Sequence, residues 1–162
     1  MVALLALALL LSACGLDVRA DASQGIARFL DAVHRDDPTA FEAAIDRPAL
    51  RADLRGQIAE VAKANGLDVG EGPSEFALDR RINPEAFRMV EAQTGEALPL
   101  APTAAQVAVL MKVGDRRHVC LQDPARHRCL LSFAKQDKVW RLVGMQANGL
   151  KIELPPAPPA KR

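Results

Sequence analysis

The chain has 162 residues and a formal net charge of +1, with 49% hydrophobic and 25% charged residues, which is the composition of an ordinary globular domain. A charge this close to zero provides no bulk positive field for nucleic acid or another polyanion. Aromatic residues are scarce, with five Phe, one Trp and no Tyr, which argues against a base-stacking surface and an aromatic-lined sugar groove.

The chain begins with an uncharged apolar segment, MVALLALALLLSACG, that ends in small residues. Thirteen residues precede Cys14, fewer than the about 20 that a membrane-spanning helix needs, so the segment has the length of a signal-peptide apolar region. The tetrapeptide Leu11-Ser12-Ala13-Cys14 resembles the lipobox of bacterial lipoproteins, in which two small residues follow a leucine and precede the cysteine. No Lys or Arg precedes the apolar run, which departs from the usual pattern.

The lipobox resemblance implies that signal peptidase II cuts before Cys14 and that the cysteine thiol carries a diacylglycerol. The domain would then be held at a membrane by lipid. Gly15 follows the cysteine, where inner-membrane lipoproteins of enteric bacteria typically carry Asp, so the resemblance points to the outer membrane, facing the periplasm. We expect a signal peptide at 1–13, a tether at 14–22, one folded domain at 23–152 and a Pro-rich disordered tail at 153–162. The alternative is a buried N-terminal helix.

The first half of the expected domain is helical. Residues 21–36 carry apolar side chains at the spacing of one helix face. Two further helices are expected to begin at Asp37 and Asp46, because each is a good N-cap followed closely by proline. The second of these is expected to end at Asn65-Gly66, a strong C-cap signal.

The middle of the chain is less regular. After a loop at 67–75, a short helical piece is expected at 76–81. Another helix is expected to follow, with Asn83 as its cap, Pro84 inside it and Gly95 beyond its end. Residues 104–113 alternate as a strand would, but Thr103 and Gln106 form a capping box before them, and we favour a helix.

From Arg116 onward the hydrophobic period changes to two. Three strand-like runs, RHVCLQ, HRCLLSFA and KVWRLVGM, are separated by the short turns DPAR and KQDK. The sequence therefore predicts an α+β fold in which several N-terminal helices pack on one face of a C-terminal antiparallel meander of three or four strands.

Turns centred on these segments would place Cys120 opposite Cys129 and Phe133 opposite Trp140. One buried sheet face is then expected to carry Cys120, Cys129, Leu131, Phe133, Trp140 and Leu142. The other, half-solvated face is expected to carry Val119, Leu121, Val139 and Val143 with Arg117, Arg128 and Arg141. Opposed strand residues have α-carbons about 4.5–5.5 Å apart, which suits a disulfide in an oxidising compartment.

Three other interpretations of the two cysteines stay open. A metal site is suggested by His118-Val-Cys120 and His127-Arg-Cys129, but the two histidines would lie about 13 Å apart along the strands, so both cannot join one site. A three-ligand site with one histidine is the remaining metal alternative. A redox-active pair lacks the Cys-x-x-Cys pattern, and two free buried cysteines are the last alternative.

No phosphate loop, dinucleotide fingerprint, nucleophile elbow or zinc-protease motif is present, and we expect no cofactor and no catalytic residue. The aspartates before the helices are explained as caps. The basic residues that could contact anionic head groups or the rim of a ligand site are Arg80, Arg81, Arg116, Arg117, His118, Arg126 and Arg128.

Three further segments, DRPALRADLRGQI, NPEAF and WRLVGM, resemble a family of bacterial proteins of unknown function in which a helical half precedes an antiparallel sheet. The likeness spans roughly 25–146 and implies an uncharacterised domain with no catalytic residues to carry over. Helices followed by a sheet also look like nuclear-transport-factor-2-like cones, which use a concave sheet as a pocket.

The sequence thus predicts a non-enzymatic cell-envelope lipoprotein with a binding or interaction domain, whose membrane contact is the N-terminal lipid and whose protein partner or small ligand is unknown. The first alternative is a small-ligand-binding or hydrolytic domain with a pocket between helices and sheet, and His118 or an arginine at its rim. The second is a metal-handling envelope protein that uses Cys120, Cys129 and one histidine.

Overall fold

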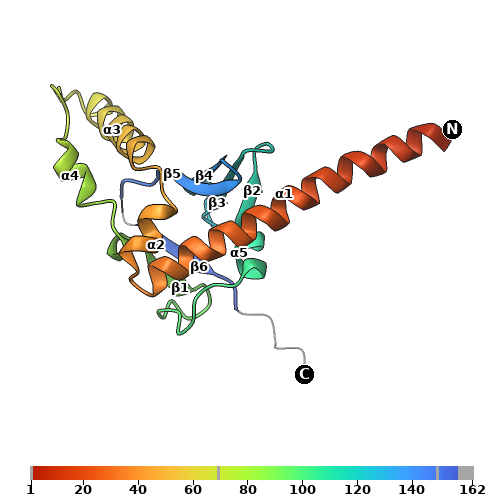
Figure 1. The fold of residues 1–162 in the computed structure, drawn as a ribbon. Helices are drawn as coiled ribbons and strands as arrows, with labels where there is room; N and C mark the ends of the chain where they lie inside the picture. The colour runs from red at the N-terminus through yellow and green to blue at the C-terminus, as the bar shows by residue number, and fades with distance from the viewer. Residues whose placement is uncertain (1, 69, 149, 157–162) are drawn as a thin grey trace.

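The computed structural model describes the backbone of residues 2–68, 70–148 and 150–156, and the side chains of residues 17–68, 70–148 and 150–156. The predicted α+β class is confirmed: helices fill the N-terminal half and a four-stranded antiparallel sheet, in the order β2-β3-β4-β5, fills the C-terminal half (Figure 1). A second, two-stranded sheet pairs β1 with β6 in parallel. The elements are α1 (Val2–His34), α2 (Pro38–Ala43), α3 (Arg47–Ala64), α4 (Glu75–Asp79), η1 (Pro84–Ala86), β1 (Arg88–Glu91), α5 (Ala104–Leu110), β2 (Met111–Val113), β3 (His118–Gln122), β4 (Cys129–Gln136), β5 (Val139–Met145) and β6 (Lys151–Leu154).

Helix α1 lies across the sheet, and its N-terminal part projects beyond the rest of the fold (Figure 1). The Phe29 ring lies 5.5 Å from that of Phe133 on β4 and 5.4 Å from that of Phe87 before β1, so one aromatic side chain joins α1 to both sheets. The helix also extends further toward the N-terminus than expected. Residues 17–22 of the expected tether are helical, and Arg19 donates to the carbonyls of Ala108 and Met111 at 2.7 and 2.9 Å.

The predicted helix caps are confirmed. The carboxylate of Asp37 accepts the backbone N–H of Ala40 at 2.9 Å, and that of Asp46 accepts the N–H of Ala49 at 3.1 Å. Each cap satisfies a backbone donor that the first helical turn leaves without a partner. Helix α3 ends at Asn65 and Gly66, where the glycine has φ +67°, the left-handed conformation that a helix end needs.

The prediction of a helix between Asn83 and Gly95 is wrong. Asn83 caps only the single 3₁₀ turn of η1, and the chain then forms β1. Met89 of β1 is buried and pairs with Ile152 of β6, which is fully buried. A distant strand thus provides the partner that turns this segment into β structure, which propensity along the chain does not reveal.

Two other boundaries are corrected. Residues 104–113, where the pattern was compatible with helix or strand, contain both. Helix α5 begins after its N-cap Thr103, which forms the capping box with Gln106, and β2 follows directly. The first residues of the tail expected at 153–162 are not disordered: Leu154 is fully buried in β6, and the carbonyl of Pro155 accepts a hydrogen bond from the Gln106 amide at 2.7 Å. Residues 157–162 of that tail lie outside the described residues.

The register of the meander also differs from the expected one. Gln136 pairs with Val139, so the β4–β5 turn is the two residues Asp137 and Lys138, with φ +47° and +67°. Both values are those of a type I′ hairpin turn. Phe133 therefore faces Leu142, and not Trp140.

Strand β3 is correspondingly shifted against β4. Leu121 pairs with Leu131 and Cys120 with Ser132, while the next pair joins Gln122 to Cys129 and leaves Leu130 as the inserted residue of a bulge. Val119 and Leu121, expected on the half-solvated face, are therefore buried with Leu131, Phe133 and Leu142 beneath the helices, and Cys120 points to the opposite face.

Candidate functional site

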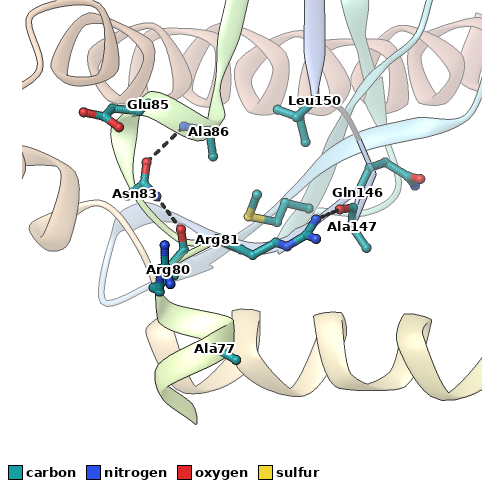
Figure 2. A pocket seen from close by; sticks show the side chains of 10 residues that line it. Ala77, Arg80, Arg81, Asn83, Glu85, Ala86, Gln146, Ala147 and Leu150 are labelled. Carbon is teal, nitrogen blue, oxygen red and sulfur yellow. Dashed lines mark hydrogen bonds between the residues drawn. The ribbon is translucent and has the colours of Figure 1, made fainter. Parts of the chain in front are cut away.

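A groove with a volume of about 570 Å³ lies beyond the end of β5, between the segment that contains α4 and η1 and the chain that leaves β5 (Figure 2). Two arginines from the α4 side dominate its polar lining, and we name it the arginine groove. Leu150 and Ala77 face each other across it, and Arg81 extends between them toward Ala147 (Figure 2). Its lining residues are Ala77, Arg80, Arg81, Asn83, Glu85, Ala86, Met145, Gln146, Ala147 and Leu150.

Local sequence explains why the two arginines point outward. Leu78 and Ile82 are 2% and 1% exposed and hold the end of α4 against the core. Arg80 and Arg81 lie between these two buried positions and are exposed. Arg81 then donates from Nη1 to the carbonyl of Ala147 at 2.9 Å, which fixes its guanidinium across the groove.

The neutral polar side chains of the lining are already hydrogen-bonded to backbone. Asn83 accepts the N–H of Ala86 at 3.0 Å and donates to the carbonyl of Arg80 at 2.6 Å. Gln146 donates to the carbonyl of Cys129 at 2.8 Å. The two guanidinium groups are thus the main donors that the groove offers to a ligand.

Nearby carboxylates pair with other arginines. Arg51 contacts Asp79 at 2.6 Å and Glu75 at 2.9 Å, and Arg47 contacts Asp79 at 3.0 Å and also Glu42. The hydrogen bond from Arg51, followed by that from Arg47, holds the pKa of Asp79 below its ordinary value of 3.8.

The two groove arginines are left without such a partner. Within the described part of the chain, neither Arg80 nor Arg81 forms a salt bridge. The carboxylate of Glu85, at the edge of the groove, points away from both of them (Figure 2). The groove therefore presents positive charge that no neighbouring side chain neutralises.

An apolar cavity of about 230 Å³ adjoins the arginine groove. Ala77, Arg81 and Ala147 line both hollows, so the two meet at these residues. The other walls of this cavity are mainly apolar, formed by Leu54, Ile58, Pro73 and Leu78, with the polar Asn148 at one side.

Helix α3 fixes the wall that the two hollows share. Asp53 accepts the N–H of Met145 at 3.0 Å. Gln57 donates to the Met145 carbonyl at 2.8 Å and accepts the N–H of Ala147 at 2.9 Å. These side chains hydrogen-bond the backbone groups at the end of β5 that a neighbouring strand would otherwise bond. They also hold the Ala147 carbonyl where Arg81 reaches it.

The structure brings Cys120 and Cys129 to bonding distance, with α-carbons 5.6 Å apart, so a disulfide joins β3 to β4. The bond lies beside a hollow of about 310 Å³ that Ser132 and Val143 also line, on the sheet face away from α1. His118 also lines this hollow, and its Nδ1 lies 3.0 Å from each carboxylate oxygen of Asp115 in the β2–β3 turn. The Arg117 backbone N–H, then His118, lowers the pKa of Asp115.

The basic residues before and after β3, named above as possible head-group or ligand contacts, do not form one surface. Arg116 and Arg117 lie in the turn before β3, whereas Arg126 and Arg128 lie after it. Four residue steps along β3 separate the two turns by about 13 Å. Arg126 and Arg128 line a separate hollow of about 280 Å³, which Asp123, Lys151 and Glu153 also line.

Cys14 lies in the helical backbone of α1, but its side chain is outside the described residues, so the expected lipid site is not seen directly. In the part of the chain that the structure describes, no group of three or more His, Cys, Asp or Glu side chains could hold a metal ion. None of the described helices is both long and apolar enough to cross a membrane.

No family model, curated protein or solved structure matches the chain. Its function is therefore argued from the sequence motifs and the geometry of the site. Sequence reasoning noticed the Arg80-Arg81 pair as a basic surface, but it did not connect the pair with the end of β5. The connection depends on contacts between residues more than 60 positions apart, such as Arg81 with Ala147.

Proposed function

We propose that the protein is a bacterial cell-envelope lipoprotein, anchored through Cys14, whose folded domain binds a partner or ligand without catalysing a reaction. The observation that carries the proposal is the Leu11-Ser12-Ala13-Cys14 motif at the end of an uncharged apolar run. The motif sets the proposed compartment, an outer membrane with the domain facing the periplasm.

The short distance between Cys14 and the fold supports a domain held close to the bilayer. Val18 packs against the core and Arg19 bonds to α5 and β2, so the fold makes contacts within five residues of the proposed anchor. Five residues span about 8 Å as helix and at most about 18 Å when extended. This leaves little freedom for the domain to move away from the membrane.

We also propose which end of the domain faces the lipid. Asp21 of α1 pairs with Lys135 at 2.7 Å, and the N–H of Lys135 bonds to the carbonyl of Arg117 at 2.8 Å. Lys135 thus links the β2–β3 turn, with Arg116 and Arg117, to Asp21, which is seven residues after Cys14. These two arginines are the proposed contacts with anionic head groups, whereas the pair in the β3–β4 turn lies at the far end.

The disulfide agrees with an envelope location, because the periplasm favours disulfides and the cytosol keeps thiols reduced. Its stabilising effect would be present only where the two cysteines can be oxidised. The lipobox and the cysteine pair are thus independent features that point to the same compartment.

A second candidate function is small-ligand binding, which the arginine groove favours. The groove is within the range of about 300–1,000 Å³ typical of small-molecule sites. Its lining combines two exposed guanidinium groups with alanine, methionine and leucine side chains. Small-molecule sites typically combine apolar walls with a few polar groups in this way.

The anchor is tested by producing the full chain in a bacterium with two membranes, in the presence of alkyne-bearing palmitate. We expect the label in the membrane fraction and an intact mass that corresponds to a chain beginning at Cys14 with its lipid. Cys14→Ser should remove the label, while the double variant Cys120→Ser/Cys129→Ser should keep it. An unlabelled, unprocessed wild-type chain in the cytosol would overturn the proposal.

A further inference from the structure

We infer that the arginine groove and the adjoining apolar cavity form one site for a small amphipathic anion, a carboxylate or phosphate head group on a short apolar tail. This inference rests on the small-ligand-binding candidate and deepens it. It does not depend on the lipid anchor, whose test by intact mass is separate.

The head group is assigned by the two guanidinium groups. Arg81 uses one N–H on the Ala147 carbonyl, and a guanidinium carries five. Arg80 is exposed beside it and, like Arg81, has no salt bridge in the described part of the chain. Arginine matches carboxylate and phosphate oxygens in a two-pronged geometry, and the contact to Ala147 already holds Arg81 in place, which lowers the entropy lost on binding.

Other ligand classes fit the polar half less well. A cation would meet two uncompensated positive charges. A neutral polar ligand can accept from the same guanidinium N–H groups, but these bonds are weaker than those to an anion and leave the positive charge of the groove without a counter-charge. An anion is therefore the ligand class that best fits the polar half.

The tail is assigned by the apolar cavity. Leu54 and Leu78, among its walls, are 1% and 2% exposed, so the cavity reaches the hydrophobic core. A volume of about 230 Å³ corresponds to seven or eight groups of water size, at about 30 Å³ each. This is room for a chain of about six to eight carbons, and each methylene buried there is expected to raise affinity about fourfold.

The junction requires head and tail in one molecule. Arg81 lines both hollows, so a ligand whose charge meets this guanidinium can place its tail past Ala77 into the apolar cavity. An inorganic anion would fill only the polar half, and an alcohol only the apolar half. We therefore predict that tight binding requires both the charged head group and the apolar tail.

Isothermal titration of the purified full chain with octanoate and octyl phosphate, below their micelle concentrations, tests this requirement. Octanol and acetate serve as the probes that lack the charge and the tail. We expect octanoate, octyl phosphate or both to bind at least about tenfold more tightly than octanol and acetate. The tighter of the two anions identifies the head group. No binding of either anion, or equal binding of octanol, would overturn the inference.

Matched variants locate the site. Arg80→Gln/Arg81→Gln should weaken binding of the preferred anion by about tenfold or more, whereas Arg126→Gln/Arg128→Gln, with the same change of charge, should leave it unchanged. Ala77→Leu should narrow the junction and weaken binding of the eight-carbon probe.

Ala105→Leu, at an exposed position of α5 outside both hollows, is the control for Ala77→Leu. Thermal unfolding verifies that each variant is folded. If Arg80→Gln/Arg81→Gln unfolds the chain, Ala77→Leu alone decides the position of the site. Equal affinity of the wild type and the folded groove variants would refute the assignment.

Discussion

Replacing Gly25 by alanine should weaken the packing of α1 on the sheet. A β-carbon at Gly25 would lie 3.0 Å from Cδ1 and 3.1 Å from Cβ of Trp140, closer than carbon atoms normally approach. The ring has little room to move, because Trp140 is 4% exposed and its Nε1 donates to Asp21 at 2.8 Å. The substitution therefore forces the helix and the tryptophan apart, or costs the tryptophan its hydrogen bond.

Two opposing effects decide the magnitude. Alanine is favoured over glycine inside a helix by about 1 kcal/mol, which would stabilise the variant. Overpacking a well-filled core costs about 1–3 kcal/mol, and loss of a hydrogen bond adds about 1 kcal/mol. The clash outweighs the propensity, and we expect Gly25→Ala to lower the free energy of unfolding by about 1–2 kcal/mol.

Gly56→Ala is the matched control. Gly56 is an exposed position of α3, and apart from its chain neighbours and the nearby backbone of its own helix, no atom lies within 4 Å of the position that its β-carbon would take. Only the difference in helix propensity acts there, so Gly56→Ala should raise the free energy of unfolding by about 1 kcal/mol. Urea unfolding followed by circular dichroism and by the fluorescence of the single tryptophan measures both. If the two variants shift stability in the same direction by similar amounts, the close contact between α1 and Trp140 is wrong.

Three further predictions concern stability. Cys120→Ser/Cys129→Ser should lose about 2.5–3 kcal/mol, from closure of a loop with sequence separation 9, and reducing agent should destabilise the wild type but not this variant in urea unfolding. Asp53→Ala leaves a backbone N–H of β5 without its acceptor and should cost about 1–3 kcal/mol, whereas Asp53→Asn, which keeps an acceptor, should cost less in the same assay. The hydrogen bond from Arg51 holds the pKa of Asp79 below 3.8, so the wild type should be more stable than Asp79→Asn above about pH 4. Urea unfolding at a series of pH values should show this difference in the free energy of unfolding disappear as the pH falls through the lowered pKa. A difference that does not change with pH would contradict this explanation.

The parts of the fold that were predictable from sequence are those that local chemistry determines. Asp37 and Asp46 were identified as caps because an aspartate followed by proline satisfies a helix start without help from distant residues. The capping box at Thr103 and Gln106 was identified for the same reason.

The errors arise where distant pairing or turn geometry decides. The sequence predicts the wrong register for the β4–β5 turn because Asp137 and Lys138 both adopt the left-handed conformation without the Asn-Gly sequence that usually indicates such a turn. β1 could not be found because its partner, β6, is about 60 residues away. Neither signal is present in a short window of sequence.

The cysteine pair shows how a contact can be predicted correctly from an incorrect register. Direct opposition of Cys120 and Cys129 was the expected geometry, but the structure pairs Cys120 with Ser132 and Cys129 with Gln122. The bulge at Leu130 shifts β4 and brings the two α-carbons to 5.6 Å. The prediction that the cysteines lie close together is confirmed because they flank one short turn. The sheet face depends on the parity of the register, and the predicted face is wrong for both cysteines: Cys129 is exposed and lines the same outer hollow as Cys120.

The arginine groove follows from how the fold covers the edge of its main sheet. Strand β5 is an edge strand, and Asp53 and Gln57 of α3 bond to its last backbone groups. This places the Ala147 carbonyl where it accepts from Arg81, while Gln146 bonds to the carbonyl of the disulfide cysteine, Cys129. The contacts that cover the edge and brace the β3–β4 hairpin thus also fix one wall of the groove and hold Arg81 against it before a ligand arrives. A site organised in this way loses little entropy when it binds, which is the physical reason to expect measurable affinity from so few polar contacts.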